Sequence, residues 1–154
     1  MKLSRYSPLL LIRAIYSLIH WRIAVRHVSF NRWKHQLNAK CPSRASHSHA
    51  PTKEKKQTNI ALALELNRHI NCVRRHIPIN FNCMHRCLAL KGLLEQHNVF
   101  PHICIGVKIN EEGKLDAHAW LTLYDELIND TTDNITQYKE ITDTQSLSQR
   151  SLNF

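Results

Sequence analysis

The sequence predicts an α+β protein in which helices precede an antiparallel sheet. Apolar residues recur at helical spacing as far as about residue 96, and from residue 103 they alternate with polar residues. The chain has 154 residues, 43% of them hydrophobic and only three of them glycine. This length and composition fit one domain with a buried core and exclude a collagen-like or low-complexity chain.

Three helices are expected before the sheet. Residues 8–27 predict an amphipathic helix, because Leu and Ile recur there every three or four residues. A second helix is expected from Thr58, its predicted N-cap, to about Ile77, since Pro78 ends it. A third helix is expected from about Cys83 to Gln96, with Asn80 or Asn82 as its cap.

The remaining elements are short strands joined by turns. Residues 103–109 and 116–124 alternate apolar and polar side chains, and the segment 110–114 between them contains Gly113, as a hairpin turn would. Asp125 and Glu126 predict a tight turn before a third strand at 127–130. In the polar tail from residue 131, Tyr138 and Ile141 are expected to dock on the sheet. The result is an antiparallel meander.

Positive charge is concentrated in the first part of the chain. Residues 1–60 contain twelve Lys and Arg against one acid, Glu54, whereas residues 61–154 contain nine against eleven. We therefore expect a basic helical arm at 1–37, a polar linker at 38–57 and a near-neutral domain at 58–154. No nucleic-acid reading element is evident, so no nucleic-acid partner is expected. Contact between the arm and a membrane surface remains open.

The N-terminus does not read as a signal peptide, because no small-residue cleavage site follows its apolar run. Arg13 interrupts that run, so no transmembrane segment is expected either. The five cysteines form an odd number without the spacing of a secreted disulfide framework. These observations favour a cytoplasmic protein with free thiols.

Three residues from separate elements could form a nucleophilic site. Cys83 starts a helix, where free N–H groups and the helix dipole stabilise a thiolate. His118 lies in the middle of a predicted strand, and Asp130 lies on the next one, so an antiparallel meander can place them side by side. A helix-borne Cys, a strand-borne His and an orienting Asp in this order are the arrangement of papain-like and transglutaminase-like enzymes.

The sequence motifs around these residues resemble those of one protein family. Blocks C-M-H-R-C-L-A-L, I-G-V, A-H-A-W and N-D occur in order between residues 60 and 135. They are similar to the lasso-peptide maturation B proteins, whose McjB-type C-terminal domain is a transglutaminase-like cysteine peptidase; the chain resembles the stand-alone form. The resemblance implies a papain/transglutaminase-like core with Cys83 as nucleophile, His118 as base and then acid, and Asp130 as the orienting carboxylate.

The resemblance also implies a reaction and its partners. The expected reaction is leader cleavage from a ribosomally synthesised lasso-type precursor peptide, during maturation of an antibiotic or bacteriocin-like natural product. The leader-recognition domain is expected as a separate protein, and an ATP-dependent cyclase closes the released core. No cofactor is expected on this chain, because it contains no Gly-rich phosphate loop; any use of ATP would pass through the partners.

The sequence departs from the family pattern at several positions. Met84 and His85 stand where Leu and a small residue or Pro are common, and Cys87 stands where Ser is usual. Cys87 shares a helix face with Cys83, so a shift of one turn would exchange the nucleophile. Cys83 is preferred because it starts the helix, and Cys87 is expected in the core.

Several other residues have more than one candidate role. Asp130 could instead cap a turn, with Asp133 or Asp125 as the orienting acid. Trp120 is expected to line the substrate pocket. Asn80 and Asn82 are candidates for an oxyanion donor, although helix capping is the more common role of Asn at such a position.

Metal binding and two other functions are the alternatives to peptide cleavage. Six potential zinc ligands show only fragments of zinc-site spacing within predicted helices, so no metal is expected; they are His69, Cys72, His76, Cys83, His85 and Cys87. The alternatives in function are acyl transfer to an amine, and a non-catalytic scaffold that recruits the cyclase.

Overall fold

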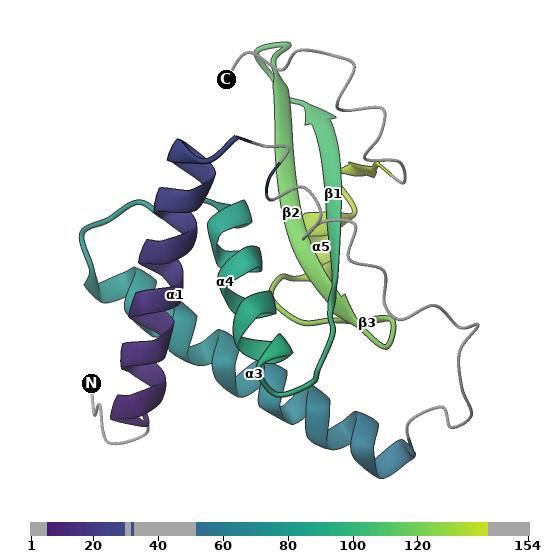
Figure 1. Cartoon of the computed structure of the whole chain (residues 1–154). Coiled ribbons are helices and arrows are strands. Elements are labelled where there is room, and N and C mark those ends of the chain that lie inside the picture. The colour runs from purple at the N-terminus through teal and green to yellow at the C-terminus, as the bar shows by residue number, and fades with distance from the viewer. Residues whose placement is uncertain (1–5, 30–31, 33–51, 142–154) are drawn as a thin grey trace.

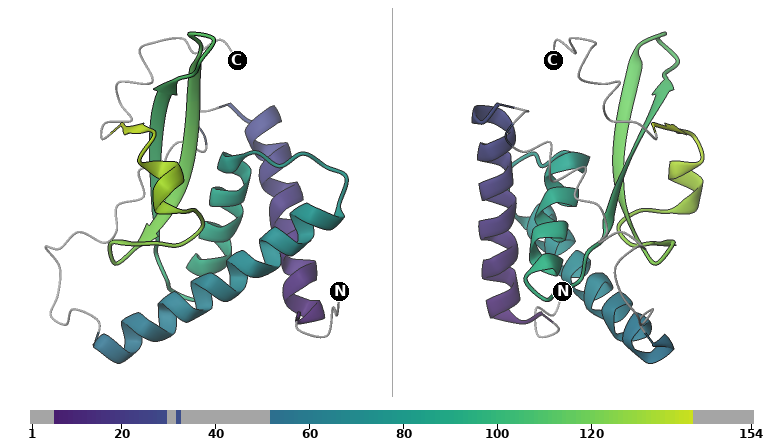
Figure 2. Two further views of the ribbon diagram at one scale, coloured as in Figure 1. Left: turned by 180° about the vertical axis from the view of Figure 1, so that it is seen from behind. Right: turned by 45° about the vertical axis from the view of Figure 1, so that its right-hand side comes forward.

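The computed structural model describes residues 6–29, 32 and 52–141 (Figure 1). Helices α1 (Pro8–His27), α3 (Lys53–His76) and α4 (Cys83–Glu95) come first, and strands β1 (His102–Ile109), β2 (Leu115–Leu123), β3 (Glu126–Leu127) and β4 (Lys139–Glu140) follow, with the short helix α5 (Thr132–Ile135) before β4. Helix α4 lies between α1 on one side and the sheet on the other (Figure 2). The expected α+β class is confirmed.

Helix α4 is where the helical layer and the sheet share one core. Most of its side chains from Cys87 to Leu94 are buried, and they pack against Leu66 and Ile70 of α3 and against Leu121 of β2. Its predicted limits are confirmed, with Asn82 as the N-cap and Gln96 as the C-cap. The residues that begin α4 are therefore held by a helix that is itself fixed on two sides.

Helix α3 begins earlier than expected. Its N-cap is Thr52, whose side chain accepts a hydrogen bond from the Lys55 N–H, and Thr58 lies inside the helix. The expectation of a cap at Thr58 was wrong because Lys and Gln, which dominate residues 53–57, are good helix formers even where no apolar stripe marks the helix. Of the predicted linker, residues 38–51 lie outside the described residues, and the division into arm, linker and domain stays a prediction.

Helix α1 has apolar side chains on both faces. Ala14 and Leu18 are fully buried against α3 and α4, and the Ser17 hydroxyl donates to the Ala89 carbonyl of α4. On the outer face, five large side chains are 37–73% exposed: Leu9, Ile12, Tyr16, Ile19 and Ile23. The expected division of this helix into one apolar and one polar face was therefore wrong.

By length and composition alone, α1 is also apolar enough to cross a membrane, with a mean hydropathy of 1.3 over its best window. The expectation that Arg13 rules out such a stretch was wrong on these criteria, because the surrounding Leu and Ile residues outweigh it. The same test is passed by core helices and signal sequences. In this structure Ala14, Ser17 and Leu18 tie α1 to the rest of the core.

The sheet has the strand order β3-β2-β1-β4, and its described pairs are antiparallel. The hairpin turn at 110–114 is confirmed, with Gly113 at φ 75°. Tyr124 and Asp125 form the next turn with φ of 55° and 68°, one residue earlier than expected. Strand β3 spans only Glu126–Leu127, so the expected strand at 127–130 was wrong beyond Leu127, and Asp130 lies after β3. Docking of the tail is confirmed, since the Ile141 N–H donates to the Ile105 carbonyl.

Candidate active site

Cys83 is the first residue of α4, and the turn around it is tightly capped. The Asn82 side chain accepts from the His85 N–H at 2.9 Å, while His85 Nδ1 accepts from the Asn82 N–H at 3.3 Å. This reciprocal pair is a capping box. The N–H groups of the first helical residues have no acceptor within a helix, so they and the helix dipole favour negative charge near the half-buried Cys83 thiol.

His118 and Asp130 are brought into direct contact. His118 lies on β2 opposite Gly106 of β1, and its Nε2 is 2.5 Å from Asp130 Oδ2. Both side chains are only 12% exposed. Nε2 therefore faces the carboxylate. Ala119 and Leu121 of the same strand belong to the core that α4 shares, so the alternation of side chains along β2 points His118 to the opposite face of the sheet.

The segment after β3 holds the carboxylate of Asp130 in place. Its Oδ1 accepts from the Thr131 N–H at 2.8 Å and from Asn134 Nδ2 at 2.9 Å. Burial by itself would raise the pKa of Asp130, but hydrogen bonds from Asn134, His118 and Thr131 outweigh it and hold that pKa below 3.8, its ordinary value. The carboxylate is therefore ionised and oriented toward the imidazole at neutral pH.

Asn134 is a site residue that the sequence did not single out. It lies on α5, and besides its bond to Asp130 its Nδ2 is 3.2 Å from His118 Nε2. It therefore contacts both members of the pair. Its only signal in the sequence is its place four residues after Asp130, in a tail that shows no apolar pattern.

Two aromatic rings enclose the imidazole. The Trp120 ring is stacked at 6.1 Å from the His118 ring, and the Tyr138 ring is tilted at 5.0 Å from it. Gly106 makes this packing possible, because a Cβ there would lie 2.8 Å from both Trp120 and Tyr138 atoms. Trp120 is itself 4% exposed, so it walls the histidine and offers little surface to a substrate.

Cys87 is a buried thiol, as expected. Burial raises its pKa to about 12, although a hydrogen bond from Asn129 Nδ2 at 3.2 Å acts in the opposite direction. The Asn129 side chain also accepts from the Leu121 N–H at 2.7 Å. Asn129 therefore ties the segment that carries Asp130 to α4 one turn after Cys83, a role that the sequence did not reveal.

The structure thus brings two of the three predicted catalytic residues together. His118 and Asp130 are in contact, and Asn129, the neighbour of Asp130, is bonded to Cys87 on α4. Within the described residues no hydrogen bond joins the Cys83 thiol to His118, so the pairing of these two stays a prediction.

Most other candidates have structural roles. Asn82 caps α4, and the carbonyl of the exposed Asn80 accepts from the Arg22 guanidinium. Asp125 lies in an exposed turn and Asp133 lies on α5, and neither is bonded to His118 within the described segments.

The proposed zinc ligands do not gather either. Across residues 6–29 and 52–141, no group of three or more His, Cys, Asp or Glu side chains could hold a metal ion. His69 is buried among the helices, where Nε2 accepts from the Ser7 N–H and Nδ1 donates to the Glu65 carbonyl.

Arg86 is the nearest positive charge on α4 to the two thiols. It follows Cys83 by three residues, on the same face of the helix, and its charge acts to lower the pKa of Cys87. Its Nε is buried and has no hydrogen-bond partner in the part of the chain that the structure describes. A guanidinium in this position favours an anion at the start of α4.

Comparison with known proteins identifies the family of the chain. The family model of the transglutaminase-like superfamily matches residues 17–143, which include α1 from Ser17 onward, the whole sheet and every site residue above. No curated protein and no solved structure matches the chain. The match covers more than half of the sequence, and the chain belongs to the transglutaminase-like superfamily.

Proposed function

We propose that this protein is a cysteine peptidase in which Cys83 is the nucleophile, His118 the general base and acid, and Asp130 the group that orients His118. The observation that carries the proposal is the 2.5 Å contact between His118 Nε2 and Asp130 Oδ2. It holds the ring in place, which is the role that an orienting carboxylate has in nucleophilic catalysis.

The proposed reaction has two halves. His118 takes the proton of the Cys83 thiol, and the thiolate attacks the scissile carbonyl; the imidazolium then gives that proton to the leaving amine as the C–N bond breaks. Water, deprotonated by His118, attacks the resulting thioester and releases the new carboxylate and the thiol. The first N–H groups of α4 are suited to bind the oxyanion of each tetrahedral intermediate.

The proposed substrate is a ribosomally synthesised precursor peptide of the lasso type, cut between leader and core. Support comes from the blocks around Cys83, His118 and Asp130, which resemble lasso-peptide maturation B proteins. On this proposal a separate leader-recognition protein and an ATP-dependent cyclase act with the chain. The four cysteines among the described residues are free, which favours a reducing compartment such as the cytoplasm.

The test is incubation of a candidate lasso precursor with the full chain, with and without the leader-recognition protein, followed by mass spectrometry. The wild type is expected to release free leader, and Cys83→Ala is expected to release none while retaining its circular dichroism spectrum. Cys72→Ala, a buried thiol on α3 away from the site, is the matched control and keeps activity. Undiminished cleavage by Cys83→Ala would reject the assignment.

The products also separate the two alternatives. A species in which the leader acyl group is joined to an added amine would indicate acyl transfer in place of hydrolysis. Absence of any product, together with intact binding of the cyclase, would indicate a scaffold.

A further inference from the structure

The outer face of α1 is a stripe of apolar side chains that nothing in the described structure covers. Leu9, Ile12, Tyr16, Ile19 and Ile23 follow each other at intervals of three, four, three and four residues, which places them along one side of the helix. Four of them are more than half exposed, and Ile19 is 37% exposed. We call these five residues the α1 stripe.

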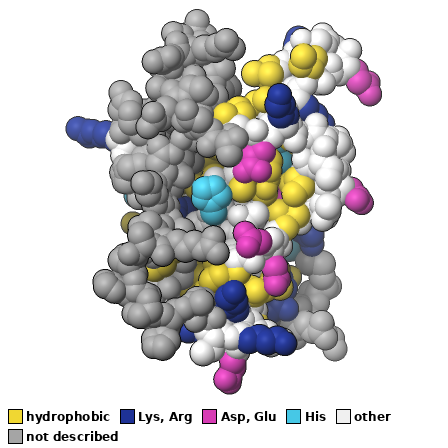
Figure 3. Space-filling view, turned by 90° about the vertical axis from the view of Figure 1, so that its right-hand side faces the viewer, with side chains coloured by type: hydrophobic (Ala, Val, Ile, Leu, Met, Phe, Trp, Pro, Cys, Tyr) yellow, Lys and Arg dark blue, Asp and Glu magenta, His cyan; other side chains and the backbone are white. Residues whose placement is uncertain are grey.

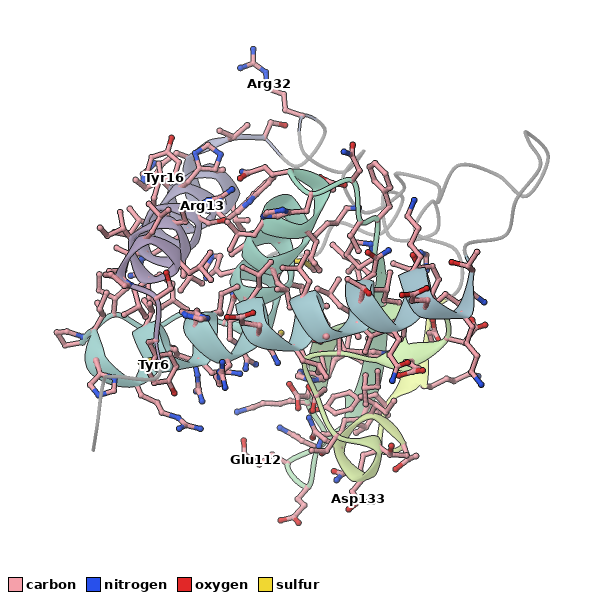
Figure 4. All side chains as sticks on the ribbon, turned by 90° about the horizontal axis from the view of Figure 1, so that it is seen from below. Tyr6, Arg13, Tyr16, Arg32, Glu112 and Asp133 are labelled. Atoms are coloured by element: carbon pink, nitrogen blue, oxygen red, sulfur yellow. The ribbon has the colours of Figure 1, made fainter. Side chains whose placement is uncertain are left out.

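The α1 stripe lies on the exposed side of the helix, and Ile12 and Tyr16 at its edge also line a groove toward α4. Helix α1 is the outermost layer, with α3 and α4 packed on its inner face only (Figure 2). Figure 4 shows Tyr16 on the outer side of α1 and Arg13 on the side toward α4, where it bonds to Gln96. A helix of 20 residues is about 30 Å long, so the stripe is a long and straight apolar edge.

The charges that border the α1 stripe are positive. On a helix of 100° per residue, Arg13 falls on one side of the stripe and Arg26 on the other, and α1 contains no acid. The first acid in the chain is Glu54. By contrast, the sheet side of the molecule mixes Asp and Glu with Lys and Arg (Figure 3).

These observations distinguish between occupants of the stripe. A second copy of the chain would bring two basic α1 helices without an acidic residue together, which costs free energy. Crossing a bilayer would require α1 to leave the core contacts of Ala14 and Leu18. An anionic bilayer surface takes up a single apolar edge, attracts the flanking Arg residues and leaves the inner face in the core.

We propose that the α1 stripe docks the protein on anionic lipid, with α1 lying in the plane of the bilayer surface. This inference is independent of the proposed peptidase function, because none of the stripe residues belongs to the candidate active site. The apolar side chains insert among the acyl chains, and Arg26 at the end of the stripe pairs with lipid phosphate.

The test uses the full chain and sedimentation with two kinds of vesicle, phosphatidylcholine alone and an equal mixture of phosphatidylcholine and phosphatidylglycerol. The protein is expected to sediment with the mixed vesicles and to be released by added salt. The double variant Ile12→Ser/Ile23→Ser is expected to lower the partition coefficient about tenfold or more. Both side chains are over half exposed, so the fold is kept.

The matched control is Ile109→Ser/Leu115→Ser, which removes two apolar side chains at the hairpin end of the sheet that are also more than half exposed. It is expected to bind mixed vesicles like the wild type. Equal loss in both double variants, equal binding to the two vesicle types, or no binding would overturn the proposal. So would a wild-type dimer in sedimentation equilibrium that only Ile12→Ser/Ile23→Ser dissociates. Peptide cleavage without vesicles is measured in parallel, so failure of docking is distinguished from failure of the peptidase assignment.

Discussion

Asn129 Nδ2 donates a hydrogen bond to Cys87 Sγ at 3.2 Å, so the residue before Asp130 is anchored to the second thiol of α4. This bond gives Cys87 a partner and a structural task, and Cys87 is 0% exposed. The nucleophile is therefore expected at the other cysteine of the pair. Cys83 is half-buried and lies at the start of the helix.

Cys87→Ala is expected to retain peptide cleavage. The change removes one small buried side chain and leaves the Asn129 amide without its acceptor, so the free energy of unfolding should fall by about 1–3 kcal/mol. Cleavage assays and urea denaturation of the same preparation measure both quantities. Loss of cleavage with an unchanged unfolding curve would instead make Cys87 the nucleophile.

Alkylation at pH 7.5 is expected to modify Cys83 ahead of the other described cysteines. Burial raises the pKa of the Cys87 thiol to about 12 and that of Cys104 to about 11, so both are protonated at this pH as well as inaccessible. Iodoacetamide labelling followed by peptide mapping measures each site separately. Cys41, which lies outside the described residues, is read from its own peptide. Labelling of Cys87 or Cys104 at the rate of Cys83 would contradict the assigned burial.

Asp130→Asn is expected to lower kcat about a hundredfold or more, because the imidazole loses the carboxylate that orients it and stabilises its charged form. It should also change how stability depends on pH. Since the folded pKa of Asp130 lies below 3.8, its ionised form stabilises the fold above that pH, and this contribution is lost as the pH falls through the folded pKa.

Urea denaturation at pH 7 and at pH 3 measures this effect. The wild type should lose more stability between the two values than Asp130→Asn does. Asp133→Asn, which removes an exposed carboxylate from the same segment, is the control and should behave like the wild type. An identical acid loss in wild type and Asp130→Asn would show that the Asp130 bonds contribute nothing to stability.

Asn134→Ala tests a positioning role. Asn134 contacts both His118 and Asp130 but does not belong to the reacting group, so kcat should fall about tenfold with KM nearly unchanged. Steady-state kinetics on a fluorogenic precursor fragment separate the two constants. Asn134→Asp, of equal size but without the amide donor, should be impaired at least as strongly. A rise in KM alone would place Asn134 in substrate binding.

Gly106→Ala is expected to destabilise the sheet by about 1–3 kcal/mol. The new Cβ would lie 2.8 Å from atoms of Trp120 and Tyr138, and neither ring can retreat without disturbing His118. Gly92→Ala is the matched control, because its Cβ would meet only Trp21 at 3.5 Å and Ala is the better helix former. Thermal unfolding of both variants measures the difference, and equal melting temperatures would refute the argument.

Predictions from the sequence are most accurate where residue type and periodicity indicate the same structure. The N-cap of α4, the hairpin at Gly113 and the neighbouring positions of His118 and Asp130 all follow from local patterns that the structure confirms. The prediction of Thr58 as the N-cap was wrong because the first turn of α3, rich in Lys and Gln, has no apolar stripe that would mark it as helical in the sequence. Asn129 and Asn134 act only through contacts made after folding, so no periodicity marks them. The exposed side of α1 was missed because spacing cannot tell which of two apolar faces is buried.

The placement of Cys83 on α4 has a consequence for how the proposed site can diversify. From Cys87 to Leu94 the same helix supplies most of the hydrophobic centre, so a substitution that moves its first turn also disturbs the whole interior. In the surrounding loops the exposed residues Asn80 and Asp125 carry no such constraint, whereas Phe81 beside Asn80 is itself buried. New peptide preferences should therefore arise by exchange of these surrounding loops, while the helix that bears the sulfur stays unchanged from one descendant to the next.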